Sequence, residues 1–168
     1  MFCSGVPFVL SRAASTGGLS TSLFVRLLNA GIEPNTLEEQ YRGHPGLMHL
    51  VKIFYPVSNL TNSVGDRASP PGVLWPAGQE FPAKFVQVSG SEGCFGKSRT
   101  NMTEAQLMLD EGMKLLKAGV LPSDLAFLSL YKGQSEEMRS MTRHDPRYLG
   151  ATFATVESFQ GRCFFRYI

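Results

Sequence analysis

Two short motifs, one near each end of the chain, hold the residues best suited to chemistry. Residues 40–45 read Gln-Tyr-Arg-Gly-His-Pro, and residues 155–162 read Thr-Val-Glu-Ser-Phe-Gln-Gly-Arg. The guanidinium of Arg42 is a planar fork that matches phosphate oxygens, and the ring of Tyr41 beside it can stack on a base. Phosphoryl transfer is catalysed mainly by positioning and charge stabilisation of this kind. A tyrosine–arginine pair alone is usually an ordinary surface pair, so its meaning depends on the neighbouring motifs.

Two further segments set a register between these motifs. Residues 10–14 read Leu-Ser-Arg-Ala-Ala, and residues 18–27 read Gly-Leu-Ser-Thr-Ser-Leu-Phe-Val-Arg-Leu. Together with the two end motifs, they resemble the C-terminal RecA-like lobe of superfamily 1 RNA/DNA helicases of the up-frameshift (nonsense-mediated-decay) type. The resemblance covers about residues 9–162, and residues 163–168 are off its pattern. We therefore expect a fragment of a two-lobe motor.

The resemblance implies that both end motifs take part in a nucleotide site. By resemblance, Arg42 is the catalytic residue that contributes an arginine to the γ-phosphate of ATP, and Tyr41 stacks on the adenine. The implied nucleotide-binding set is Gln40, Tyr41, Arg42, Gln160 and Gly161. Two positions in or beside these end motifs depart from the family pattern: Gly43 stands where the family usually has Met or Ser, and Cys163 replaces a glutamate.

A third segment resembles a nucleic-acid motif of the same family. Residues 128–134 read Leu-Ser-Leu-Tyr-Lys-Gly-Gln and resemble its Thr-Pro-Tyr-x-x-Gln segment, with Leu130 in place of the proline. A hydroxyl and backbone N–H groups at a helix start suit a nucleic-acid phosphate. The resemblance implies contacts to single-stranded RNA or DNA from Ser129, Tyr131, Gln134, Thr155 and Gln160. An ordinary strand end and helix cap remains the alternative for residues 129–134.

No phosphate-binding loop and no acidic metal-binding strand accompany these motifs in the sequence. Residues 90–98, Gly-Ser-Glu-Gly-Cys-Phe-Gly-Lys-Ser, look like a phosphate loop, but that pattern requires four residues between its first Gly and Gly-Lys-Ser. Here five residues separate Gly90 from Gly96. The next predicted helix starts near Asn101, which is too late to place Lys97 on its first turn. We therefore interpret residues 90–98 as a flexible loop.

The expected function is that of one lobe of an ATP-dependent helicase. ATP with Mg²⁺ is the implied cofactor of the intact motor, whose N-terminal RecA-like lobe is an implied partner and carries the Mg²⁺ ligands. No metal site is expected in this chain, and the isolated chain is expected to hydrolyse ATP negligibly. The alternative is a non-enzymatic nucleic-acid or protein-binding module. Two family motifs in order argue against a small-molecule enzyme whose resemblance is accidental.

Composition is that of an ordinary globular protein. The 168 residues are 43% hydrophobic and 18% charged, which suits a single domain over residues 1–168. A net charge of +2 does not by itself indicate nucleic-acid binding. Three separated cysteines without a CxxC pair suggest reduced thiols. No apolar run reaches the ~20 residues of a membrane span. The apolar segment 1–10 lacks the basic residues of a signal peptide, so a cytoplasmic or nuclear location is expected rather than secretion.

The order of predicted elements indicates the fold that positions the motifs. Helices are predicted over residues 19–30, 45–54, 101–117 and 133–143, and strands over residues 35–41, 84–88, 125–130 and 151–156. Residues 55–82, rich in Pro, Gly, Asn and Ser, are predicted to be a long surface excursion. Alternating strands and helices predict an α/β fold, a RecA-like (P-loop NTPase-type) parallel sheet with helices on both faces.

Overall fold

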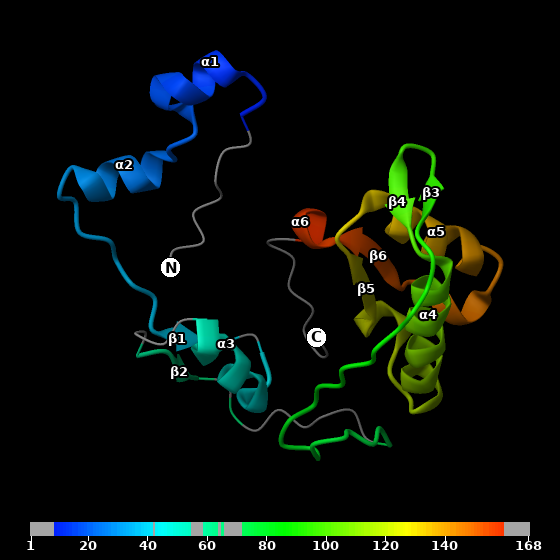
Figure 1. Ribbon diagram of the computed structural model, residues 1–168. Helices are drawn as coiled ribbons and strands as arrows, with labels where there is room; N and C mark the ends of the chain where they lie inside the picture. The colour runs from blue at the N-terminus through cyan, green and yellow to red at the C-terminus, as the bar shows by residue number, and fades with distance from the viewer. Residues whose placement is uncertain (1–8, 42, 55–58, 64, 66–71, 160–168) are drawn as a thin grey trace. The chain divides into compact units, whose positions relative to one another are not determined.

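The computed structural model describes residues 9–41, 43–54, 59–63, 65 and 72–159 (Figure 1). Two compact units divide the chain: Met1–Gln40 with Leu50–Thr61, and Tyr41–His49 with Asn62–Ile168. The buried hydrophobic residues of the described chain all belong to the second unit. The expectation of one domain over residues 1–168 stays a prediction.

The first unit is made of short elements. They are α1 (Arg12–Ala14), η1 (Ser15–Leu19), α2 (Leu23–Asn29), β1 (Glu39–Gln40) and β2 (Thr61–Asn62), and β1 pairs with β2. The helix predicted over residues 19–30 is shorter than expected because Ser22 is extended and caps α2, its Oγ accepting the Val25 N–H at 3.3 Å. Gly31, with φ of 85°, follows the end of α2 as expected. The strand predicted over residues 35–41 is confirmed only as β1.

The second unit carries most of the secondary structure. Helix α3 (Met48–Phe54) begins in this unit, and its residues from Leu50 on are assigned to the first unit. The other elements of the second unit are η2 (Pro45–Leu47), β3 (Gly93–Phe95), β4 (Ser98–Thr100), α4 (Met102–Lys117), η3 (Pro122–Asp124), β5 (Ala126–Ser129), α5 (Lys132–Thr142), η4 (Pro146–Tyr148), β6 (Thr152–Thr155) and α6 (Val156–Phe159). The helices predicted over residues 45–54, 101–117 and 133–143 and the strands over 125–130 and 151–156 are confirmed, within one residue at each end.

Helix α4 begins where the sequence signal lies. The Asn101 Oδ1 accepts the backbone N–H groups of Thr103 and Glu104 at 3.1 and 3.2 Å, and its Nδ2 donates to the Glu104 carboxylate at 3.1 Å. This pairing satisfies N–H groups that have no partner within the helix. Ala118 is the C-cap of α4, and Gly119, which follows it, adopts the left-handed conformation with φ of 93°.

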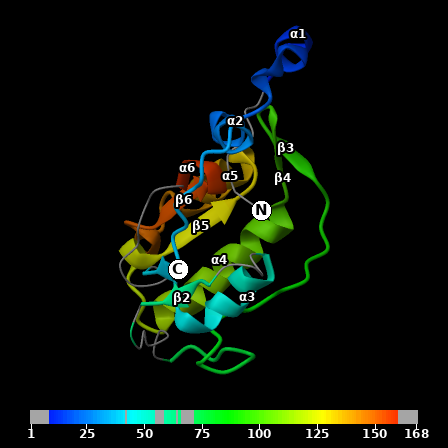
Figure 2. The same ribbon diagram turned by 90° about the vertical axis from the view of Figure 1, so that its left-hand side faces the viewer.

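Strands β5 and β6 form a parallel pair joined through α5. Their register sets Phe127 opposite Phe153 and Ser129 opposite Thr155, and both views show the two strands side by side (Figures 1 and 2). Helix α5 contacts both strands, and α4 contacts α5. Because the pair is parallel, Ser129 and Thr155 lie together at its carboxyl edge.

The core of this unit is centred on Phe127. Its ring stacks on Phe153 with centroids 4.8 Å apart and meets the tilted ring of Tyr148 at 5.9 Å. Helix α4 presents Gly112 here, and a Cβ at that position would lie 2.4 Å from the Phe127 ring. The remaining members of the buried cluster are Ala105, Leu109, Leu125 and Met138. The helix thus packs on the strand at a distance that only glycine allows.

The strand predicted over residues 84–88 is wrong, since these residues belong to no helix or strand. Phe85 is 89% exposed. Lys84 tethers the segment to α4 through an ion pair with Glu111 at 2.8 Å, and an open cavity of about 550 Å³ lies between the segment, α4 and the start of β5. Alternation alone does not make a strand, because each strand also needs a neighbour for its backbone hydrogen bonds.

The fold is therefore mixed α/β, with one parallel pair and two short two-stranded ladders among the described residues. None of the helices in that part of the chain combines the length and the apolar character needed to cross a membrane.

Candidate functional site

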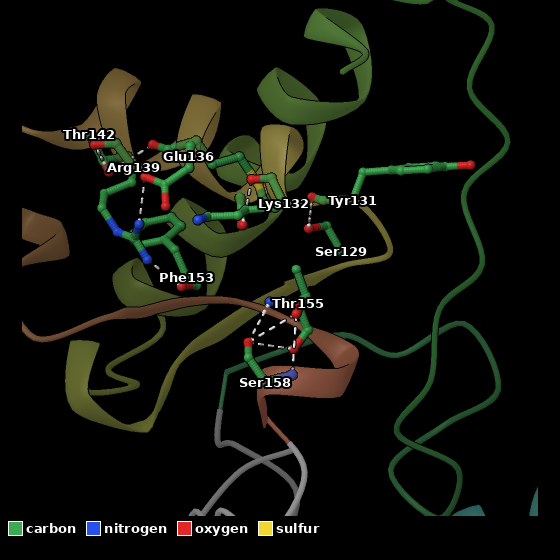
Figure 3. A network of polar contacts seen from close by, with 11 residues as sticks. Ser129, Tyr131, Lys132, Glu136, Arg139, Thr142, Phe153, Thr155 and Ser158 are labelled. Carbon is green, nitrogen blue, oxygen red and sulfur yellow. Dashed lines mark hydrogen bonds and ion pairs between the residues drawn. The ribbon is translucent and has the colours of Figure 1, made fainter. Parts of the chain in front are cut away.

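The carboxyl edge of the β5–β6 pair gathers hydroxyl side chains from two strands. Ser129 and Thr155 end these strands in register. Ser129 is buried, and its Oγ donates to the backbone carbonyl of Tyr131 at 2.9 Å, which turns the chain from β5 into α5 (Figure 3). Two of the predicted nucleic-acid residues are thus brought together by the sheet itself.

Thr155 and Ser158 form a closed network of four hydrogen bonds (Figure 3). The Thr155 N–H donates to the Ser158 Oγ at 3.0 Å, and the Ser158 N–H donates to the Thr155 Oγ1 at 3.2 Å. The two hydroxyls lie 3.0 Å apart, and the Ser158 hydroxyl donates to the Thr155 carbonyl at 3.1 Å. This reciprocal cap starts α6 and fixes the Thr155 rotamer. Sequence reasoning missed Ser158, although its spacing of three from Thr155 is the signal of such a cap.

The first turn of α5 is capped by a residue distant in sequence. The Gly133 N–H donates to the Ser98 Oγ of β4 at 2.9 Å, and the Gln134 N–H donates to the Tyr131 carbonyl at 3.1 Å. A Cβ on Gly133 would lie 2.9 Å from the Arg99 carbonyl oxygen and from the Ser98 Cβ. These N–H groups, which the sequence suggested for a phosphate, therefore have partners within the chain.

The predicted residues Tyr131 and Gln134 have opposite environments. Gln134 is 6% exposed, and its amide accepts the Asn101 N–H at 2.7 Å and donates to the Asn101 carbonyl at 3.0 Å. Tyr131 is 53% exposed, and its ring points away from Ser129 (Figure 3). Gln134 is thus held by the backbone at the start of α4, whereas Tyr131 is exposed to solvent.

The sequence that mimics a phosphate loop is a β-hairpin. Strands β3 and β4 pair antiparallel with Phe95 opposite Ser98, and Gly96, with φ of 62°, and Lys97 form the turn. A phosphate loop needs a helix directly after its Gly-Lys-Ser, but here β4 follows. The rejection of the phosphate-loop interpretation is confirmed, and the expected flexible loop is instead an ordered hairpin.

An open cavity of about 430 Å³ lies between this hairpin and the end of β5. Its walls include Arg99 and Glu92 on one side and Ser129, Leu130 and Tyr131 on the other. No motif in the sequence indicates that residues so far apart in the chain line one cavity.

Arg139 ties α5 to β6 beside this edge. Its guanidinium donates to the Phe153 carbonyl at 2.6 Å and pairs with Glu136 at 2.7 Å (Figure 3). This contact holds the strand that ends at Thr155 against α5, which starts at Lys132.

The shifted pKa values of this unit lie away from the carboxyl edge. Burial raises the pKa of Tyr148, whose hydroxyl donates to the Leu109 carbonyl at 2.8 Å. The pKa of Asp145 is lowered by hydrogen bonds from Arg147. The pKa of Glu111 is lowered by hydrogen bonds from Lys114 and then Lys84. These groups stabilise the fold and lie outside the candidate site.

The remaining predicted residues belong to the nucleotide set. Arg42, Gln160 and Gly161 lie outside the described residues, so the expectation that Arg42 and Gln160 share one sheet edge stays a prediction. Gln40 is half-buried in β1, and Tyr41 is 64% exposed. Within the described ranges, no three His, Cys, Asp or Glu side chains gather in a way that could hold a metal ion.

Comparison with known proteins adds the family. A family model described as an AAA domain matches residues 19–164. The chain is 34% identical to the regulator of nonsense transcripts 1 homolog of Drosophila melanogaster, over 95% of this chain and 14% of that protein. It is 36% identical to regulator of nonsense transcripts 1 of Caenorhabditis elegans, over 95% of this chain and 16% of the relative. The ATP-dependent helicase NAM7 of Saccharomyces cerevisiae is 32% identical, over 93% of this chain and 17% of its own length.

These matches agree with the family resemblance of the sequence. The chain belongs to the AAA-domain family and, within it, to the superfamily 1 helicases of the up-frameshift type. It spans 14–17% of the length of these relatives. What it carries is a helicase domain.

Proposed function

We propose that this chain is the C-terminal RecA-like lobe of an ATP-dependent helicase and that the carboxyl edge of β5 and β6 contacts single-stranded RNA or DNA. The observation that carries the proposal is the register of the parallel pair, which sets Ser129 beside Thr155. In open α/β sheets, ligands bind outside the carboxyl ends of the strands. The RecA-like assignment rests on the family and on the β5–α5–β6 unit.

The contacts proposed at this edge are to the sugar-phosphate backbone. The Ser158 N–H fixes the position of the Thr155 hydroxyl oxygen, and the hydroxyl hydrogen, now donated to the Ser158 Oγ, turns to a phosphate oxygen on binding. Tyr131 offers an exposed ring on which a base can stack. Gln134 and Ser129 stabilise this edge through hydrogen bonds, Gln134 to the Asn101 backbone and Ser129 to the Tyr131 carbonyl. Hydroxyls directed at phosphates carry no sequence information, so binding should be indifferent to base sequence.

The proposed nucleotide role belongs to the two end motifs. Arg42 contributes charge to the γ-phosphate of ATP, Tyr41 stacks on the adenine, and Gln40, Gln160 and Gly161 complete the contacts. ATP with Mg²⁺ is the substrate of the whole motor. The phosphate loop and the Mg²⁺ carboxylates come from an N-terminal RecA-like partner lobe, since the Gly-Lys-Ser of this chain forms a hairpin turn.

A second candidate is a non-enzymatic lobe that binds nucleic acid without a hydrolysis cycle. The hairpin turn at Lys97 favours it, because the chain then has no phosphate loop of its own. The two candidates differ in whether Arg42 acts on ATP once a partner lobe is present.

Nucleic-acid binding is tested with a fluorescent single-stranded oligonucleotide and the 168-residue chain. We expect dissociation constants in the non-specific range of about 10⁻⁴ to 10⁻⁶ M, with a shallow dependence on salt because few phosphates are contacted. Thr155→Ala should weaken binding, whereas Ser140→Ala, on the exposed side of α5, should not. No binding at low salt, or equal effects of both variants, would refute the nucleic-acid role.

The ATP role is tested in a chimaera in which residues 19–162 replace the matching segment of the Saccharomyces cerevisiae relative. Arg42→Ala should lower ATP turnover by about 10³ to 10⁵, whereas Arg143→Ala, at the exposed end of α5, should leave it unchanged. An active chimaera indifferent to Arg42→Ala would contradict the catalytic assignment, and an inactive chimaera would favour the non-enzymatic lobe.

A further inference from the structure

We propose that Arg99 on β4 binds a phosphate of single-stranded nucleic acid in the cavity that Tyr131 also lines. In the free protein, Glu92 forms an ion pair with Arg99 and competes with that phosphate. The inference deepens the proposed nucleic-acid role and rests on it. It adds the β3–β4 hairpin as a second wall of the binding site and a carboxylate that limits the affinity of that site.

Two walls of one cavity carry the proposal. The hairpin and its flank contribute Glu92 and Arg99, and the β5 end contributes Leu130 and Tyr131, around a space of about 430 Å³. Leu130 is 83% exposed, so the β5 wall presents apolar surface as well as the tyrosine ring. A nucleotide unit needs a flat apolar face for its base and a cation for its phosphate, and this cavity offers one on each wall.

The distance between the walls is fixed by hydrogen bonds behind the cavity. The Ser98 Oγ accepts the Gly133 N–H at 2.9 Å, and the Gln134 amide brackets both backbone groups of Asn101. Gly133 also lies too close to Arg99 and Ser98 to carry a side chain. The hairpin therefore cannot move relative to the start of α5 without breaking these partly buried hydrogen bonds, and the site is preorganised for its ligand.

Arg99 is available because its present partner is weak. It pairs with Glu92 on the same hairpin, and the two side chains are 63% and 66% exposed. An ion pair between exposed groups contributes little to stability. A phosphate accepts the same guanidinium fork in a two-point hydrogen bond, so it can replace the Glu92 carboxylate.

The charge of the cavity explains why Glu92 limits binding. Among the described residues that line it, Arg99 is the only basic side chain, and Glu92 and Glu104 are both acidic. While Glu92 occupies Arg99, the lining repels phosphate. Removing the charge of Glu92 frees Arg99 and removes one repulsion, and both effects increase affinity.

The test is a mutant cycle read by fluorescence anisotropy of a labelled single-stranded oligouridylate over a range of salt concentrations. Arg99→Gln should weaken binding about fivefold and lower the log–log salt slope by about 0.7, the amount expected for one phosphate contact on a single strand. Glu92→Gln should tighten binding about fivefold. The double variant should lose most of that gain, because the gain acts through Arg99.

Matched controls separate a local site from net charge. Lys117→Gln removes a positive charge at the far end of α4, and Asp124→Asn removes a negative charge in η3, before the amino end of β5. Neither control should change the affinity for oligouridylate as the Arg99 and Glu92 variants do. Arg99→Lys, which keeps the charge and loses the fork, should fall between wild type and Arg99→Gln.

Each other result overturns the proposal in a recognisable way. If the wild-type chain binds no oligouridylate, both the proposed function and this inference fail. If Thr155→Ala weakens binding while the hairpin variants match their charge controls, the inference alone fails. Tightening by Glu92→Gln that persists without Arg99 would also overturn it, since Glu92 would then act only through repulsion.

Discussion

At the scale of single residues, Gly133 connects the hairpin to the start of α5. It is buried, and a Cβ there would meet three atoms of Ser98 and Arg99 at 2.9 to 3.0 Å, two of them backbone oxygens. Backbone atoms cannot move aside as a flexible side chain does. We therefore predict that Gly133→Ala lowers the free energy of unfolding by about 1–3 kcal/mol, the range of overpacked core sites. Chemical denaturation measures this change.

The control for this substitution is Gly17→Ala. A Cβ at Gly17 would meet no atom within 4 Å, so the midpoint of unfolding should be unchanged. A Gly133→Ala variant as stable as wild type would mean that the hairpin does not pack on α5 as described.

Glu111 makes stability depend on pH. Hydrogen bonds from Lys114 at 2.7 Å and Lys84 at 2.8 Å lower its pKa below the ordinary 4.5. The unfolded chain, whose Glu111 has the ordinary pKa, takes up its proton first as the pH falls. The stabilisation is therefore complete above about pH 4.5 and is lost as the pH drops through the lower, folded-state pKa.

We predict that Glu111→Gln costs under about 1 kcal/mol near neutral pH, because the pairs are partly exposed to solvent. Thermal unfolding followed from neutral pH into acid should show a smaller loss of stability in this variant than in wild type. Asp110→Asn changes the neighbouring carboxylate, which has no lysine partner among the described contacts, and should leave the acid loss as in wild type.

At the scale of elements, local signals predicted α4 and β5 well. Asn101 and Glu104 define the start of α4 by a cap that depends only on neighbouring residues. The apolar run around Phe127 predicts a strand, and β5 packs its ring in the core. The signal failed at residues 84–88, since alternation cannot tell whether a second strand is present to pair with.

Long-range contacts were beyond the reach of the sequence. Ser98 caps α5 across 35 residues, and Gln134 binds the Asn101 backbone across 33 residues. No periodic pattern or motif in the sequence indicates either contact. The edge formed by Ser129 and Thr155 was predictable, because the carboxyl ends of parallel strands meet. The part of the site contributed by the hairpin was not, since residues 90–98 are interpreted from the sequence as a flexible loop, whereas in the structure β3 pairs with β4 there.

Gln134 provides the prediction for this scale. Gln134→Ala leaves the Asn101 N–H without its acceptor, whereas the Asn101 carbonyl keeps the Ala105 N–H at 3.0 Å. An unsatisfied buried N–H costs about 1–3 kcal/mol. We expect a lower midpoint of chemical unfolding. Gln106→Ala, on the exposed face of α4, is the matched control and should change little. Weakened nucleic-acid binding at unchanged stability would instead assign Gln134 a direct contact.

At the scale of the whole molecule, the position of Lys97 governs what the 168-residue polypeptide can do with ATP. Lys97 lies on a hairpin turn, and the sequence of the chain contains no phosphate-loop pattern. Positioning of the phosphates supplies most of the catalysis in phosphoryl transfer. We predict no ATP hydrolysis above background in a steady-state phosphate-release assay with or without single-stranded RNA. Turnover abolished by Lys97→Ala would restore the phosphate-loop interpretation.

The parallel pairing of β5 with β6 also sets an order of events during synthesis on the ribosome. The β3–β4 hairpin closes between neighbouring residues, but Ala126 must wait for Thr152, which emerges only after all of α5. Until then, β5 is an apolar strand with no partner on that edge, the kind of segment that pairs wrongly with other chains. Codon choice or a pause between residues 130 and 152 would lengthen this exposed interval, so the yield of soluble protein should depend on the rate at which α5 is translated.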